Sequence, residues 1–139
     1  MQTRIVVVAV IKDKDGRVLL GKKRQDVGPY PNKWHLPGGK VEIGQEILAD
    51  SLKREVKEET GLDVLDAQPI FFDEDITEDK HGVTTHYIFL DFECKIREGC
   101  AVPSADLVTL QWFKKTELEQ LDINKPSLRL FRKIGLLDQ

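Results

Sequence analysis

Residues 38–62 read GGKVEIGQEILADSLKREVKEETGL and contain the clearest helical pattern of the chain. Between residues 46 and 60, apolar side chains recur every four positions, as they do on one face of an α-helix. This apolar stripe consists of Leu48, Leu52 and Val56. We expect Gly44 to be the N-cap of the helix and Gly61 to end it in the left-handed conformation. The pattern therefore predicts an amphipathic helix that packs one face against a core.

The polar side of this helix carries a cluster of carboxylates. At about 100° per residue, three glutamates fall within a narrow arc beside the apolar stripe. They are Glu55, Glu58 and Glu59. Like charges at these spacings repel one another, whereas a hard divalent cation prefers such oxygen ligands. The carboxylates alone leave two interpretations open, a metal site and a solvated acidic face.

The order of residues around the glutamates is more specific. Residues 54–62, REVKEETGL, resemble the second half of the Nudix box, which is Arg-Glu-apolar-X-Glu-Glu-X-Gly-apolar. In the first half of the box, a glycine is followed after five residues by a glutamate and after seven more by the arginine. Glu46 has the expected distance to the arginine, but the position that follows Gly39 after five intervening residues is occupied by Gln45. We interpret this as a one-residue insertion, the alternative being that Lys40 replaces the first glycine.

This resemblance extends over most of the chain and implies a fold and a reaction. The fold is α/β, the Nudix α/β/α sandwich with a mixed β-sheet, in a single domain of residues 1–139. The reaction resembles that of the family, in which water attacks one phosphorus of a nucleoside diphosphate linked to a group X. The expected cofactor is Mg²⁺ or Mn²⁺, and the expected partner is a small-molecule nucleotide substrate.

The resemblance also implies a metal site. Its expected ligands are the backbone carbonyl of Gly39 and the carboxylates of Glu55, Glu58, Glu59 and Asp106. Catalysis is expected to depend on the same three helix glutamates and on Arg54, with Glu55 as an alternative general base. Glu46 is expected to pair with Arg54 and so to orient the helix.

Substrate contacts are expected outside the box. Lys23 and Arg24 end a predicted strand, where their charges can meet phosphate oxygens. Asn124 resembles an asparagine of MutT-type enzymes that contacts the base. The three histidines of the chain are scattered and show no metal-ligand spacing.

The remaining sequence predicts strands and two further helices. Two strands, 5–11 and 17–22, are expected to be joined as a hairpin by the turn at residues 14–16, and a loop is expected at 25–33. Three later strands are expected at 67–73, 84–93 and 107–113, with a polar loop at 75–82 and helices at 115–121 and 127–137. Strands before, between and after helices indicate a mixed α/β sandwich.

Composition excludes several other classes of protein. The chain has 139 residues, the size of one domain, and 21 basic against 24 acidic residues give a net charge of −3. General nucleic-acid binding is therefore disfavoured, because it relies on a basic face. The apolar run at 5–11 is shorter than the roughly 20 residues that span a bilayer, so no membrane segment is expected. Cys94 and Cys100 form no disulfide or zinc pattern, which favours a cytoplasmic protein.

Substrate choice lies outside the box, and several branches of the family stay open. A MutT-like nucleoside triphosphate pyrophosphatase, which releases NMP and pyrophosphate, is the preferred interpretation. ADP-ribose or nucleotide-sugar hydrolysis is the alternative, and a non-catalytic nucleotide-sensing module is a third. Homodimers are common among relatives, so a homodimer is also compatible with the resemblance.

Overall fold

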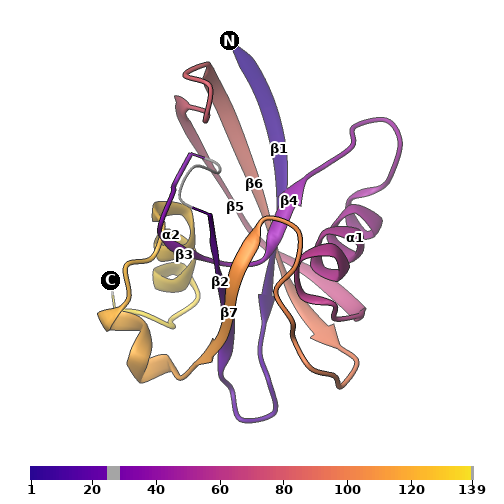
Figure 1. Ribbon diagram of the computed structural model, residues 1–139, viewed down its shortest axis with the longest axis vertical. Helices are drawn as coiled ribbons and strands as arrows, with labels where there is room; N and C mark the ends of the chain where they lie inside the picture. Colours follow the sequence, from indigo (N-terminus) through magenta and orange to yellow (C-terminus); the bar gives the residue numbers. More distant parts are fainter. Residues whose placement is uncertain (25–28, 139) are drawn as a thin grey trace.

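β1 (Gln2–Ile11) lies inside a four-stranded sheet with the order β4-β1-β6-β5, and a second sheet has the order β3-β2-β7. The computed structural model describes residues 1–24 and 29–138 (Figure 1). β1 and β6 run parallel, and the other pairings of the described strands are antiparallel, so the first sheet is mixed. The remaining strands are β2 (Val18–Lys23), β3 (Trp34–His35), β4 (Gly38–Lys40), β5 (Val64–Glu78), β6 (Thr84–Ile96) and β7 (Leu107–Phe113).

The helices cover the strands from both sides. They are α1 (Leu48–Thr60), the 3₁₀ helix η1 (Lys115–Gln120) and α2 (Lys125–Lys133). Figure 1 shows α1 and α2 on opposite sides of the strands. This arrangement confirms the expected mixed α/β sandwich.

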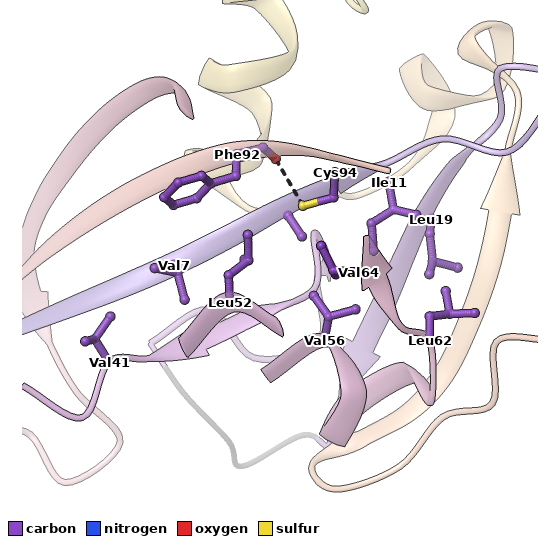
Figure 2. Packing of buried hydrophobic residues seen from close by; sticks show 11 residues of the cluster. Val7, Ile11, Leu19, Val41, Leu52, Val56, Leu62, Val64, Phe92 and Cys94 are labelled. Carbon is purple, nitrogen blue, oxygen red and sulfur yellow. Dashed lines mark hydrogen bonds between the residues drawn. The ribbon is translucent and has the colours of Figure 1, made fainter. Parts of the chain in front are cut away.

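β1 contributes side chains to both hydrophobic cores. On one face, Val7 and Ile11 pack with Leu52 and Val56 of α1, and all four side chains are fully buried (Figure 2). Truncating a leucine at such a site costs about 2–5 kcal/mol of stability. The apolar stripe of the predicted helix therefore attaches α1 firmly to the central strand.

The second core lies under α2. Leu130 and Phe131 of α2 are buried with Val10 of β1 and Leu20 of β2. Because β1 has buried residues in both cores, it separates the two helices and fixes their positions relative to the sheet.

α1 begins later than expected. It starts at Leu48 with Ile47 as the N-cap, so the prediction of Gly44 as N-cap was wrong. Gly44 instead lies in the preceding loop with a positive φ of 83°. The physical reason is a local turn, in which the carboxylate of Glu46 accepts the backbone N–H of Glu42 at 3.3 Å. Leu48 is 40% exposed, so the buried stripe begins one turn after it.

The C-terminal end of α1 agrees with the prediction. Gly61 has a φ of 77°, in the left-handed region, and its N–H donates to the carbonyl of Lys57 at 3.0 Å. Glycine adopts this conformation without the steric penalty that a Cβ atom brings. The chain then turns directly into β5.

The two expected N-terminal strands and the turn between them are present, but their pairing as a hairpin was wrong. β1 and β2 belong to different sheets and share a single isolated bridge, between Lys12 and Val18. Both edges of β1 are already paired, with β4 and β6, and both edges of β2 are paired with β3 and β7. The turn thus carries the chain from one sheet to the other.

Half of the polar loop expected at 75–82 is strand, because β5 includes residues 75–78. β5 extends to Glu78 and pairs with β6 along its length, which leaves only a short turn before Thr84. Two aspartates of β5 are neutralised by α2, because Arg129 forms ion pairs with Asp73 and Asp75. Polar residues are therefore tolerated on this edge strand.

The C-terminal elements differ from the prediction in length and type. β7 has the predicted bounds, whereas the helix expected at 115–121 is the 3₁₀ helix η1. α2 begins at Lys125 rather than at residue 127, because Asn124 caps it by accepting the N–H of Ser127 at 3.0 Å. Of the loop expected at 25–33, residues 25–28 lie outside the described residues.

Within residues 1–24 and 29–138, no helix has the length and apolarity that crossing a membrane requires.

Candidate active site

Glu59 is the buried member of the helix glutamates. It is 5% exposed, and its carboxylate accepts the backbone N–H of Gly38 at 2.9 Å. Burial raises the pKa of Glu59 to about 7, while the Gly38 N–H and the charge of Lys23 act in the opposite direction. The last turn of α1 is thereby joined to the start of β4.

Glu55 lies against the second glycine of β4. A Cβ atom on Gly39 would come within 2.1 Å of a Glu55 carboxylate oxygen. Burial raises the pKa of Glu55, and the hydrogen bond from Arg54 opposes that rise. A side chain at position 39 would displace the carboxylate, so glycine is required there by close approach.

Arg54 connects the loop before α1 to the glutamates on it. Its Nη2 and Nε donate to the two carboxylate oxygens of Glu46, at 2.6 and 3.0 Å. Its Nη1 donates to Glu55 at 2.9 Å and to Glu58 at 3.4 Å. The hydrogen bonds from Arg54 lower the pKa of Glu46 to about 2.

The same contact identifies the glutamate of the first half of the box. Glu46, not Gln45, meets the arginine, and the side chain of Gln45 is exposed. Both interpretations, an insertion between Gly39 and Glu46 and a replacement of the first glycine by Lys40, have Glu46 at this position of the box. The contact agrees with both of them.

The donor set fits a hard divalent cation by its chemistry. Three carboxylates lie within the last two turns of one helix, and Gly39, whose backbone carbonyl is the further expected ligand, lies against Glu55. In the part of the chain that the structure describes, no three His, Cys, Asp or Glu side chains converge closely enough to hold a metal as they stand. The reason is that Arg54 holds Glu55 and Glu58, while Glu59 faces Gly38.

The other charged residues predicted for the site are Lys23, Arg24 and Asp106, and the structure places them in different surroundings. Lys23 lies in the wall of a pocket beside Gly38 and Gly39. Arg24 instead forms an exposed ion pair with Asp106, at 3.9 Å. Asp106 contributes to the rise in the pKa of Glu59, so its charge acts on the glutamate cluster from outside it.

The pocket has a volume of about 350 Å³, which is the size of a small-molecule site. Gly38 and Gly39 of β4 line it, and β1, β6 and α2 supply further walls. Asn124 is part of the wall contributed by α2, where its carbonyl oxygen also caps the helix.

Asp91 of β6 and Tyr30 are polar residues of the pocket wall that were not predicted as site residues. Tyr87, Phe89 and Asp91 occupy every second position of β6, so they lie on the same face of the strand and in the same pocket wall. An aspartate on the otherwise apolar face of a strand is the feature of the sequence from which Asp91 could have been predicted. Tyr30 donates a hydrogen bond to Asp75 from a loop, and nothing in its neighbourhood in the sequence marks it.

His35 also lies in the pocket wall, although no function was predicted for it. Its Nδ1 lies 2.8 Å from the carbonyl oxygen of Leu36, and its Nε2 has no partner among the described residues. Burial lowers the pKa of His35 to about 4, so the ring is neutral at physiological pH.

Comparison with known proteins identifies a family that matches this chain. Residues 2–134 match the family model of the NUDIX domain. A curated protein from Enterobacter sp. (strain 638), named nucleoside triphosphatase NudI, is 30% identical over 143 residues, covering 99% of this chain and 100% of that protein. A protein of the same name from Escherichia coli O17:K52:H18 (strain UMN026 / ExPEC) is 32% identical with the same coverage.

Solved structures show the same fold. A MutT protein from Bacillus halodurans has a TM-score of 0.76 at 27% identity, covering 98% of this chain and 84% of that one. A MutT NUDIX hydrolase from Burkholderia pseudomallei has a TM-score of 0.73 at 26% identity, covering 98% and 97%.

Proposed function

This chain belongs to the NUDIX family and is a pyrophosphohydrolase acting on acid anhydrides, and on that premise we propose that it cleaves nucleoside triphosphates to nucleoside monophosphate and pyrophosphate. The observation that carries the proposal is that Glu59 and Glu55 of α1 lie against Gly38 and Gly39, two glycines that line a pocket of about 350 Å³. Similarity over the full length to proteins named nucleoside triphosphatase supports the choice of substrate class.

The metal would be held by the carboxylates of Glu55, Glu58 and Glu59 and the carbonyl of Gly39. When bound, Mg²⁺ or Mn²⁺ supplies charge neutralisation for the phosphates and a lower pKa for coordinated water. Glu55 and Glu58 must release Nη1 of Arg54 to join such a site, because that nitrogen now holds both. Asp106 is the further acid that we propose to support the site from the β7 side.

The protein's own residues position the substrate. Lys23, in the pocket wall, is placed to bind phosphate oxygens, and we assign Arg24 the same role at the rim once it leaves Asp106. Glu46 keeps Arg54, and through it the start of the glutamate cluster, in a fixed orientation. Asn124 is the proposed contact for the base.

Hydrolysis adds water across one phosphoanhydride bond. A new P–O bond forms to the water oxygen, the bridging P–O bond breaks, and pyrophosphate carries the bond's electron pair away. As the alternative to its role as a metal ligand, Glu55 can accept the proton of the attacking water, since its carboxylate lies against Gly39, which lines the pocket.

The proposed function is tested by a hydrolysis screen with Mg²⁺. Canonical and oxidised nucleoside triphosphates, ADP-ribose and nucleotide sugars are offered to the wild type, to Glu59→Gln and to Glu119→Gln, whose site is exposed on η1. Turnover of a triphosphate that is lost only in Glu59→Gln supports the proposal. If only ADP-ribose or a nucleotide sugar is hydrolysed, the protein is a hydrolase of that substrate and the triphosphate proposal is wrong. Nucleotide binding without any turnover would favour a nucleotide sensor.

Two further properties stand as proposals. We place the protein in the cytoplasm, which agrees with the free thiols of Cys94 and Cys100. Homodimerisation is a prediction that light scattering on the purified protein checks directly.

A further inference from the structure

Asp91 is a buried acid that the proposed chemistry does not use. It is 4% exposed and lies in the wall of the pocket, on the same strand as Tyr87 and Phe89. These two rings are stacked, with centroids 6.1 Å apart and an interplanar angle of 10°. In the parallel pairing with β1, Asp91 stands opposite Val8. The carboxyl group thus lies among apolar neighbours.

Asp91 has no hydrogen-bond partner among the residues that the structure describes. The charged groups that act on it are Asp73 on the neighbouring strand and Arg129 on α2, but Arg129 is already engaged by Asp73 and Asp75. Burial and the charge of Asp73 raise the pKa of Asp91 to about 7, and the charge of Arg129 acts in the opposite direction. A buried carboxyl without a partner costs stability, which is expected where a ligand completes its hydrogen bonds.

The position of Asp91 relative to the glutamates is set by strand pairing. Val8 pairs with Gly38 on one side and with Asp91 on the other. Asp91 is therefore two strand spacings, about 10 Å, from the glycine whose N–H holds Glu59. One substrate whose phosphates lie at Gly38 can reach Asp91 with its other end.

We propose that Asp91 determines base specificity, accepting a hydrogen bond from an N–H group on the edge of the nucleobase remote from its sugar. This inference rests on the proposed function, because it takes the ligand to be a nucleoside triphosphate. A neutral carboxyl group also offers its O–H to an adjacent acceptor on the base. The ligand class is thus a nucleotide whose base presents an N–H donor beside an acceptor atom.

The test compares natural triphosphates with analogues that lack the donor. ATP, GTP, CTP and UTP all carry an N–H on this edge, whereas purine ribonucleoside triphosphate and 2-pyrimidinone ribonucleoside triphosphate carry none. For the preferred natural base, kcat/KM in the wild type should exceed that of the analogue with the same ring by about 10-fold or more. Asp91→Leu should bring this ratio close to one.

Two variants separate recognition from a structural role. Asp91→Asn keeps an acceptor and a donor on a side chain of the same shape, so the ratio should be largely retained. Glu93→Gln alters an exposed carboxylate on the same strand and should leave the ratio unchanged. Absence of discrimination in the wild type, or an equal loss for natural substrate and analogue in Asp91→Leu, would overturn the inference.

A binding measurement keeps this result independent of turnover. Dissociation constants for the α,β-methylene forms of the same six compounds are measured with Ca²⁺ present. If no triphosphate is hydrolysed but binding still discriminates through Asp91, the proposed function fails and this inference holds. If none of the six binds, or all bind alike, the inference about Asp91 is wrong.

Discussion

Glu46 and Arg54 form a two-point ion pair between the loop before α1 and the second turn of the helix, with N···O distances of 2.6 and 3.0 Å. Through its remaining nitrogen, Arg54 also holds Glu55 and Glu58. Glu46 therefore acts on the glutamate cluster without belonging to it. It is a positioning residue, and a planar guanidinium suits this role because it fixes direction as well as charge.

Replacing Glu46 should disturb the site at a distance. In Glu46→Gln, Arg54 loses a charged partner, and we expect kcat to fall about 10-fold or more with a smaller change in KM. The melting temperature should fall at neutral pH. Because pairing lowers the pKa of Glu46 to about 2, this loss should fade as the pH falls from about 4.5 towards 2.

Gln45→Ala is the matched control for that experiment, since its exposed side chain adjoins Glu46 and does not meet Arg54. It should behave like the wild type in steady-state kinetics. A larger loss in Gln45→Ala than in Glu46→Gln would show that Gln45 occupies the glutamate position of the box.

Gly39→Ala should displace Glu55, because the added Cβ would meet its carboxylate at 2.1 Å. We expect at least about 100-fold loss of kcat, the effect of moving a group that bears on the reacting atoms. Gly99→Ala is the control, as its Cβ would meet its nearest neighbour at 3.8 Å. Wild-type activity in Gly39→Ala would contradict the close approach.

Metal removal should abolish turnover and leave the fold intact. After treatment with EDTA, we expect no activity, recovery with Mg²⁺ or Mn²⁺, and a thermal transition that remains cooperative because both cores are apolar. Glu58→Gln should weaken Mn²⁺ binding about 10-fold or more, as measured by electron paramagnetic resonance. Unchanged affinity for Mn²⁺ would remove Glu58 from the proposed ligand set.

Asp91 should make stability depend on pH. Its pKa of about 7 in the folded state lies above that of an unfolded aspartate, so unfolding releases a proton between about pH 4 and 7. As the pH rises from about 4 to about 7, the free energy of unfolding of the wild type should therefore fall relative to that of Asp91→Asn by on the order of a few kcal/mol. Above about pH 7 the difference between the two proteins should stay constant. Chemical denaturation of both proteins at several pH values measures it, and a difference independent of pH would contradict the burial of an unpartnered acid.

The elements that could be predicted from the sequence depend on local signals. The glycine that ends α1 and the bounds of β7 follow from residues next to one another, and the structure has both where they were expected. The pairing of β1 was wrong because it depends on β4 and β6, which a local turn pattern does not reveal. The start of α1 was wrong because Glu46 bonds across the loop instead of entering the helix.

The candidate site divides in the same way. The glutamates and Arg54 follow a fixed spacing on one helix, so their contacts could be anticipated from the box. Asp91 and His35 come from two different sheets and meet in one pocket only after folding. Their burial, and the resulting shifts in pKa, exist only in the folded chain.

Cleavage of a nucleoside triphosphate to monophosphate and pyrophosphate is tested most directly by phosphorus NMR of the products formed from the preferred triphosphate with Mg²⁺. We predict nucleoside monophosphate and pyrophosphate in equal amounts. The rate should fall at least about 100-fold in Glu59→Gln and be unchanged in Glu119→Gln, because metal-site charge stabilisation amounts to several kcal/mol. Release of nucleoside diphosphate and phosphate, or full activity in Glu59→Gln, would contradict the account.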